Sequence, residues 1–377
     1  MSIIRSFAAL YVLCIVLCNA AISYAHASFD LDTWMEDFVI KTKQIIVPGY
    51  CGAFNASVIR WEGRLLLCFR VRDENMVSTF EIGFIELDND FNAIGKAHIL
   101  EVRYEDPTCL QRKQDPRLII VHNKLHILYS EFIKIDDIIT RRMFIAEVQR
   151  EGDTFFIDAP VCLHPFEGWS KRWEKNWVPF VYHDTLHLAY SVVPHRIMEP
   201  LLPRGECVTR HATLSSMAWD WGDPRGGTPA IKDGDEYIAF FHSSRLMTTS
   251  YSGNVKMTHY VMGAYTFSAE PPFEIRRMSA HPIVGPGFYA GPTYNTWKPL
   301  RVVFPMGLLI EGDTVWVTYG RQDFEIWVAQ IDKNALYKSL VPREKISEHA
   351  AYLKSEGQEM SMIHNRSYER FLWKMFL

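Results

Sequence analysis

The chain has 377 residues, of which 48% are hydrophobic and 22% are charged, and it carries a formal net charge of −4. This composition is that of a globular protein with a sizeable core, arranged as one large domain or two, and it excludes intrinsic disorder. The weak negative charge, with no block of Lys and Arg residues, excludes nucleic acid as a default partner.

The N-terminus differs from the rest of the chain. Arg5 precedes the apolar run FAALYVLCIVLCNAAISYA, and Ala25 and Ala27 form an A-x-A-type cleavage position. We therefore predict a secretory signal over residues 1–27. An uncleaved membrane anchor is the alternative, because the run is nearly long enough to span a bilayer. In both cases the remaining chain is predicted to be exported, as a periplasmic or secreted protein or as one attached to the membrane.

Cysteine usage gives little sign of metal or redox chemistry. Cys14 and Cys18 lie in the predicted signal, which leaves five cysteines, an odd number, so at least one thiol is predicted to be unpaired or to join another chain. Neither C-x-x-C nor H-E-x-x-H spacing occurs, so we predict no metal site and no organic cofactor. The remaining cysteines are Cys51, Cys68, Cys109, Cys162 and Cys207.

A hairpin pattern recurs five times along the chain. RWEGRLLLCFRV, VHNKLHILYSE, YHDTLHLAYSV, IKDGDEYIAFFHS and IEGDTVWVTYG each have Gly, Asn or Asp at a turn, followed by apolar residues that alternate with others. The pattern is typical of a hairpin whose second strand is half-buried. The spacing of the turns matches one four-stranded propeller blade with long loops. The turn residues are Gly63, Asn123, Asp184, Gly234 and Gly312.

Segments between the hairpins, such as TFEIGFIELD and FEIWVAQID, supply outer strands because β-branched and aromatic residues nearly alternate along them. The sequence therefore predicts an all-β fold, a single five-bladed β-propeller over residues 28–343, with a β-sandwich as the alternative. The stretch REKISEHAAYLKSEG predicts a short helical C-terminal extension over residues 344–377.

One position near the start of each predicted inner strand lies eight residues before a turn, and four of these five positions fall in a distinctive local phrase. In a propeller these positions converge on one mouth of the central channel. For any single phrase the simpler interpretation is an ordinary strand start. Together with aromatic residues such as Trp173, however, the phrases predict a polar pocket suited to a sugar. The positions, each eight residues before a turn, are Asn55, Asp115, Asn176, Gly226 and Phe304.

These phrases resemble a known family. QDPRL, EKNWVPF, GGTPAIK followed by FFH, and VVFPMGLLIEGDTVWVTYGRQD resemble, in order and spacing, the landmarks of glycoside hydrolase family 130, the inverting β-mannoside phosphorylases and related β-mannosidases. The resemblance covers Phe54 to Leu340 and implies a five-bladed propeller that cleaves β-mannosides with inversion, by phosphorolysis or hydrolysis. A β-mannosyltransferase with the same site and a non-catalytic glycan-binding propeller are the alternatives.

The resemblance implies that Asp115 is the general acid, which protonates the leaving glycosidic oxygen directly or through a sugar hydroxyl. Pro116 would hold this acid at the head of its strand, and burial among aromatic residues is expected to raise its pKa toward that of a proton donor. Arg117 would act in the opposite direction. The alternative is a structural carboxylate that pairs with Arg117.

Inorganic phosphate is the co-substrate that the resemblance implies, because a phosphorylase needs cations where an inverting hydrolase needs a second carboxylate. Lys175, Lys232 and His242 match phosphate-binding positions of the family. A further arginine has no counterpart here, and only His195 could replace it. These departures predict weak phosphate binding or hydrolysis instead. The candidate bases for hydrolysis are Glu174, Glu105 and Asp106.

The predicted partner is an oligosaccharide or glycan. Arg70 and Asp73 lie where the first blade would reach the pocket, and Asp323 in YGRQD matches an acid of the family. A solvated turn is the alternative for Arg70 and Asp73. The predicted substrate contacts are Asn55, Arg70, Asp73, Arg117, Asn176, Trp177, Thr228, Tyr319 and Asp323.

Overall fold

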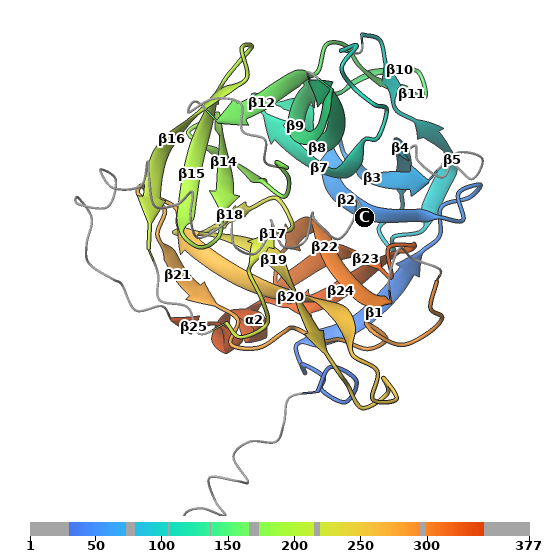
Figure 1. Ribbon diagram of the computed structural model, residues 1–377, viewed down its shortest axis with the longest axis vertical. Coiled ribbons are helices and arrows are strands. Elements are labelled where there is room, and N and C mark those ends of the chain that lie inside the picture. The colour runs from blue at the N-terminus through green and yellow to red at the C-terminus, as the bar shows by residue number, and fades with distance from the viewer. Residues whose placement is uncertain are drawn as a thin grey trace, which may run out of the picture.

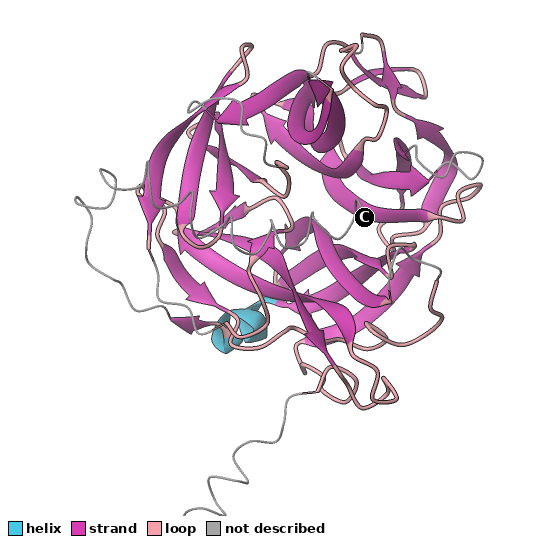
Figure 2. Cartoon of the chain, viewed as in Figure 1, coloured by secondary structure: helices cyan, strands magenta, loops and turns pink. Residues whose placement is uncertain are grey.

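The computed structural model describes residues 30–72, 80–104, 106–135, 137–165, 173–214, 219–294 and 299–342. The predicted signal, the predicted helical extension and Asp73 lie outside these ranges. The described chain consists almost entirely of β-strands that surround a common centre (Figures 1 and 2). Within the described ranges the one helix is α2 (Lys333–Ser339), and no helix there has the length and apolar character needed to cross a membrane.

Antiparallel pairing groups the described strands into four-stranded units that follow one another along the chain. The first strand of a unit lies near the centre and the last lies at the periphery (Figure 1). The first unit consists of β2 (Ala53–Trp61), β3 (Arg64–Arg72), β4 (Phe80–Leu87) and β5 (Ala93–Ile99). The second consists of β7 (Gln114–Val121), β8 (Lys124–Ile135), β9 (Ile138–Glu147) and β12 (Val161–Pro165). The third consists of β13 (Val178–Tyr182), β14 (Thr185–Ser191), β15 (His195–Leu201) and β16 (Glu206–Thr213).

The last two units are less regular. The first strand of the fourth unit is divided in two, and the unit consists of β17 (Arg225–Gly226), β18 (Ile231–Asp233), β19 (Glu236–Met247), β20 (Met257–Ser268) and β21 (Ile275–Met278). The fifth takes its outermost strand from the start of the described chain and consists of β22 (Leu300–Glu311), β23 (Thr314–Arg321), β24 (Glu325–Asp332) and β1 (Val39–Ile45). Short additional strands are β6 (Glu101–Val102), β10 (Gln149–Glu151), β11 (Thr154–Ile157) and β25 (Val341–Pro342).

All five predicted hairpins are present, joining β2 to β3, β7 to β8, β13 to β14, β18 to β19 and β22 to β23. Their turns need the left-handed backbone conformation, which glycine adopts freely and which Asn and Asp tolerate better than other residues. This requirement explains the turn pattern in the sequence. The left-handed turn residues are Gly63 (φ 75°), Asn123 (φ 59°), Asp184 (φ 58°), Gly234 (φ 65°) and Gly312 (φ 60°).

The hydrophobic core lies between neighbouring units. Leu66 of the first unit shares a buried cluster with Leu118 of the second, and Met143 of the second shares one with Trp177 of the third. A large cluster joins the third, fourth and fifth units, and another joins the fifth unit back to the first. Because the packing returns to its starting point, the predicted all-β, propeller-like fold class is confirmed.

Closure of the fifth unit by β1 predicts a strong effect of truncation. Ile45 of β1 is 3% exposed and pairs with Ile326 of β24. A chain that begins at residue 47 should lose its cooperative unfolding transition, because it exposes the edge of β24 and opens the packing between the fifth and first units. Urea unfolding followed by circular dichroism measures this, with a chain that begins at Asp30 as the control. Equal midpoints for the two chains would contradict closure by β1.

Candidate active site

Three of the five positions predicted to converge share an unusual backbone conformation. Asn55, Asp115 and Asn176 are left-handed, with φ values of 48°, 55° and 63°. In the β2–β3 and β7–β8 pairs the strand register also shifts at these residues, as it does at a β-bulge. Asn and Asp are the non-glycine residues that adopt this conformation most readily. The repeated Asn or Asp in the sequence therefore marks a repeated structural position.

Asp115 lies at the centre of a buried polar network and is 7% exposed. The Asn55 side-chain amide donates a hydrogen bond to its Oδ1 at 2.9 Å, and Nη1 of Arg70 lies 3.3 Å from the same oxygen. On the other side, Nη2 of Arg141 lies 3.7 Å from Oδ2 and also donates to the Gln114 side chain. The carboxylate is thus held between two arginines from different units.

The pKa of Asp115 corrects one expectation. Burial acts to raise it, as predicted, but the charges of Arg70 and Arg141, the hydrogen bond from Asn55 and the charge of Arg117 outweigh burial and hold the pKa well below its usual range. The prediction of a raised pKa was wrong, because Arg141 was not identified from the sequence and the combined charges of the guanidinium groups outweigh the effect of burial. Asp115 is a carboxylate in this state.

Arg117 has a structural role, because its guanidinium group hydrogen-bonds to backbone carbonyls of two units. Its side chain is 0% exposed. Nε donates to the Gly227 carbonyl at 2.6 Å, Nη2 donates to the Gly226 carbonyl at 3.4 Å, and Nη1 donates to the backbone carbonyl of Asp115 at 3.1 Å. These hydrogen bonds link the second unit to the fourth. Arg117 is therefore not accessible to a sugar, contrary to the prediction. Its hydrogen bonds go to backbone carbonyls and not to the Asp115 carboxylate, so the alternative of a salt bridge does not hold either.

Further basic side chains gather beside Asp115. Burial, followed by the charges of Arg141 and Arg225, lowers the pKa of Lys175 to about 7. Arg225 pairs with His242 across β17 and β19. Burial, together with the charges of Arg225 and Lys175, holds the pKa of His242 well below its usual value. Burial and mutual repulsion disfavour the charged forms of Lys175 and His242, so a bound anion would stabilise those charged forms.

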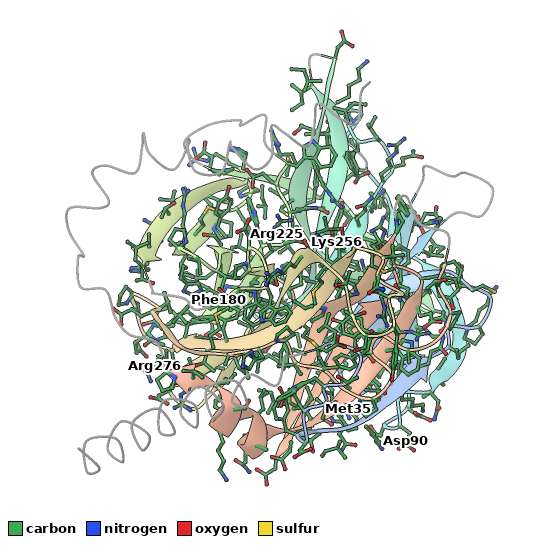
Figure 3. All side chains as sticks on the ribbon, turned by 60° about the horizontal axis from the view of Figure 1, so that its bottom comes forward. Met35, Asp90, Phe180, Arg225, Lys256 and Arg276 are labelled. Atoms are coloured by element: carbon green, nitrogen blue, oxygen red, sulfur yellow. The ribbon has the colours of Figure 1, made fainter. Side chains whose placement is uncertain are left out.

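The remaining convergent positions also reach this region. A Cβ atom on Gly226 would overlap the Asn176 carbonyl, so the two backbones are in close contact. The Phe304 ring lies 4.2 Å from the His242 ring. Figure 3 shows Arg225 within the body of the molecule, whereas Arg276 lies at its edge. All five units thus contribute to one site.

Asp323 adds a second carboxylate to the site. It is half-buried in the turn between β23 and β24, again with a left-handed backbone (φ 50°). Burial raises its pKa, Arg70 opposes the increase, and the nearby charge of Asp115 adds to it. The structure therefore brings Asp323 together with Asn55, Arg70, Asp115, Lys175, Asn176 and His242.

Three predicted sugar contacts belong instead to the core. Trp177 and Tyr319 are both 0% exposed and pack in clusters between units. Thr228 is also fully buried, and its hydroxyl accepts a hydrogen bond from the Phe240 backbone at 3.0 Å. Strand residues alternate between two faces, so a residue adjacent to a site position points into the packing between sheets. The stacking and hydroxyl-binding roles predicted for these residues are therefore incorrect.

Two predicted phosphate ligands lie away from the site. His195 is 1% exposed, donates from Nδ1 to the Phe273 carbonyl at 2.7 Å and packs against Phe267. Burial lowers the pKa of His195 to about 4, so at neutral pH it has no positive charge with which to replace an arginine. Lys232 is exposed on β18, opposite Tyr237 in β19. Neither residue is retained as a phosphate ligand.

Sequence patterns missed Arg141 and Arg225. Arg141 belongs to a segment interpreted as an ordinary outer strand, although it is 5% exposed. Arg225 directly precedes the GGTPAIK motif, on which the family resemblance partly rests, but it was not itself predicted as a site residue. A charged residue in a strand otherwise expected to be buried was the available signal for Arg141. Its partner could not be inferred, because Asp115 is distant in sequence.

Two of the three predicted bases lie in the described ranges. Glu174 accepts a hydrogen bond from the Tyr190 hydroxyl at 3.4 Å and lies near Arg142. Asp106 is exposed and accepts hydrogen bonds from Thr108, while Glu105 lies outside the described residues. In the described ranges, no group of three or more His, Cys, Asp or Glu side chains could hold a metal ion.

No protein-family model and no curated protein matches the sequence. Solved structures do match its fold. A β-1,2-mannobiose phosphorylase from Listeria innocua is 13% identical, with a TM-score of 0.53 over 83% of this chain and 97% of the other. A structure from the GH130 family of mannoside phosphorylases, said to contain glycoside hydrolases that target β-1,2 mannosidic linkages in Candida mannan, is 12% identical, with a TM-score of 0.52 over 80% and 93%.

A third match is MPT-1, a GDP-Man-dependent mannosyltransferase from Leishmania mexicana. It is 11% identical, with a TM-score of 0.50 over 78% of this chain and 91% of the other. At these identities the similarity concerns the fold. The resemblance to glycoside hydrolase family 130 therefore holds at the level of the fold.

Proposed function

We propose that this chain is a carbohydrate-active enzyme that cleaves β-mannosides with inversion, and that Asp115 is its general acid. The observation that supports this most directly is the buried Asp115 carboxylate, which lies at the meeting point of all five units, with the Asn55 amide and the Arg70 guanidinium at one oxygen and Arg141 near the other. Asn55, Arg70 and Asp323 would bind sugar hydroxyls.

We propose phosphorolysis as the reaction. An oxygen of inorganic phosphate would attack C1 of the mannosyl unit, the C1–O bond to the leaving sugar would break, and the leaving oxygen would take the proton of Asp115. The products would be mannose 1-phosphate and the shortened sugar. Lys175 and Arg225 would hold the phosphate through their charges, and the uncharged His242 would contribute a hydrogen bond from its ring N–H, so that Arg225 supplies the positive charge for which the sequence offered only His195.

The low pKa of Asp115 is consistent with a reaction in which phosphate binds before Asp115 is protonated. The cations around Asp115 keep it ionised, and an ionised carboxylate cannot donate a proton. A phosphate dianion bound beside Arg141 and Lys175 would offset their charges and raise the pKa of Asp115. Phosphate would then serve both as the nucleophile and as the group that allows Asp115 to be protonated.

Hydrolysis and transfer remain the second candidates. Hydrolysis needs a base on the far side of the sugar, whereas the Glu174 carboxylate accepts a hydrogen bond from Tyr190 and that of Asp106 accepts from Thr108. Transfer from a nucleotide sugar would use the same cations to bind a diphosphate. A glycan-binding protein without catalysis would bind mannosides and release no product.

Phosphate dependence tests the proposal. The full chain is incubated with β-1,2-mannobiose, with and without phosphate, and the released sugars are identified. Mannose 1-phosphate should form only with phosphate, and Arg225→Ala should raise the KM for phosphate at least about tenfold, because one charge-assisted contact is lost. Arg276→Ala removes an arginine from the periphery, with its side chain 39% exposed, and serves as the matched control.

Each alternative outcome has a separate meaning. Free mannose released at equal rates without phosphate would replace phosphorolysis by hydrolysis. Equal KM values for phosphate in the Arg225→Ala and Arg276→Ala variants would contradict the assignment of Arg225. Reaction only with a nucleotide-activated mannose would indicate a transferase.

A further inference from the structure

Trp173 presents an aromatic ring to solvent close to the site. It lies two residues before Lys175 and is 38% exposed. Its ring meets Phe132 edge-on, with centroids 5.2 Å apart and planes at 88°. Trp177, by contrast, is fully buried in the same stretch of chain. Trp173 therefore offers a flat apolar surface that a ligand can reach.

A continuous set of contacts joins Trp173 to the proposed acid. Phe132 pairs with Arg141 across β8 and β9, and the Arg141 guanidinium lies 5.2 Å from the centre of the Phe132 ring. Arg141 in turn lies 3.7 Å from the Asp115 carboxylate. The backbone N–H of Glu174 donates to the Arg141 carbonyl at 2.9 Å, which holds the adjacent Trp173 beside this strand.

This position restricts what Trp173 can bind. Asp115 is buried, so the sugar unit that reacts there fills the interior of the site. The unit joined to it would extend toward solvent, and Trp173 is an exposed ring linked to the site through Phe132 and Arg141. An exposed indole binds the C–H face of a sugar ring and excludes water from it, while making few demands on the arrangement of hydroxyl groups.

We propose that Trp173, supported by Phe132, is the platform for the leaving-side sugar unit of the substrate. This inference rests on the proposed function and extends it to a second subsite. Recognition there depends on a ring face, so the second subsite should accept several pyranosides, while the buried site selects the reacting unit. Trp173 is thus a residue that determines preference for a disaccharide over a monosaccharide.

Calorimetric titration of the full chain with mannose and with β-1,2-mannobiose tests this subsite, without phosphate and in an Asp115→Asn background that slows turnover. Trp173→Ala should weaken mannobiose binding about five- to tenfold and leave mannose binding within about twofold, because only the disaccharide reaches the platform. Trp173→Phe, which keeps a flat ring, should restore most of the loss. Trp34→Ala, at another tryptophan with 37% exposure, is the matched control.

The outcomes separate the subsite from the reaction. An unchanged ratio of mannobiose to mannose affinity in Trp173→Ala would overturn the platform while leaving the β-mannoside proposal intact. Equal loss of both sugars in Trp173→Ala would also overturn it, since that indicates damage to the whole pocket. If the chain with Asp115 and Trp173 both intact bound neither sugar, the proposed function itself would be contradicted, and the subsite with it.

Discussion

Asp115→Asn should reduce kcat by about two to four orders of magnitude, the usual contribution of a general acid. Asparagine has nearly the same shape and can still accept the hydrogen bond from Asn55, but it has no proton to deliver to a leaving oxygen. The measurement is the rate of product release from β-1,2-mannobiose in the presence of phosphate, with kcat and KM determined separately. The loss is expected in kcat.

The effect of Asp115→Asn on catalysis must be distinguished from an effect on folding. The substitution leaves Arg70 and Arg141 without the carboxylate between them, so urea unfolding and phosphate binding are measured on the same variant. Asp313→Asn, in an exposed turn, is the control for an unspecific effect of the change. A fully active and stably folded Asp115→Asn variant would refute the assignment of Asp115.

Gly226→Ala should destabilise the fold by about 3 kcal/mol or more, the upper range for adding an atom to a packed interior. The new Cβ would overlap the backbone carbonyl of Asn176 and the side chain of Val178, and a backbone atom within a β-unit cannot move aside easily. The same displacement would move Lys175 and should lower activity as well. Urea unfolding gives the change in free energy.

Gly52→Ala is the matched control, because it adds the same atom where the nearest neighbour is a carbon of Phe324 at 3.8 Å, an ordinary contact distance. We expect it to change stability by less than about 0.5 kcal/mol. Equal stability of the two variants would show that the third and fourth units do not depend on the close approach at Gly226.

Local backbone requirements allowed the hairpins and many of the strands of this protein to be predicted from its sequence. A hairpin turn such as that at Asn123 requires a left-handed residue wherever it occurs, so it leaves a mark that needs no knowledge of distant contacts. The strands beside each turn add an alternating apolar pattern. The constant spacing of eight residues before a turn relates Asn55 to Asp115 in the sequence, and the structure shows that both are left-handed at strand starts.

Contacts between residues that are distant in the chain could not be predicted in this way. Arg141 approaches Asp115 only because β9 and β7 belong to the same folded unit, and Arg225 reaches Lys175 only where the fourth unit meets the third. The direction of the Asp115 pKa depends on these neighbours, so expectations from burial alone failed. The predicted substrate contact of Trp177 was wrong for a related reason, because only packing between units decides which face of a strand is covered.

The sequence by itself determined the all-β class, the positions of the hairpins and the convergent positions at the strand starts, because each depends on the conformation of a few consecutive residues. Tertiary structure alone decided which of the candidate side chains share a site, which are buried between sheets, and which charges surround Asp115. Electrostatic energy depends on distance in space, and residues from all five units come within reach of one another only when the ring of sheets closes.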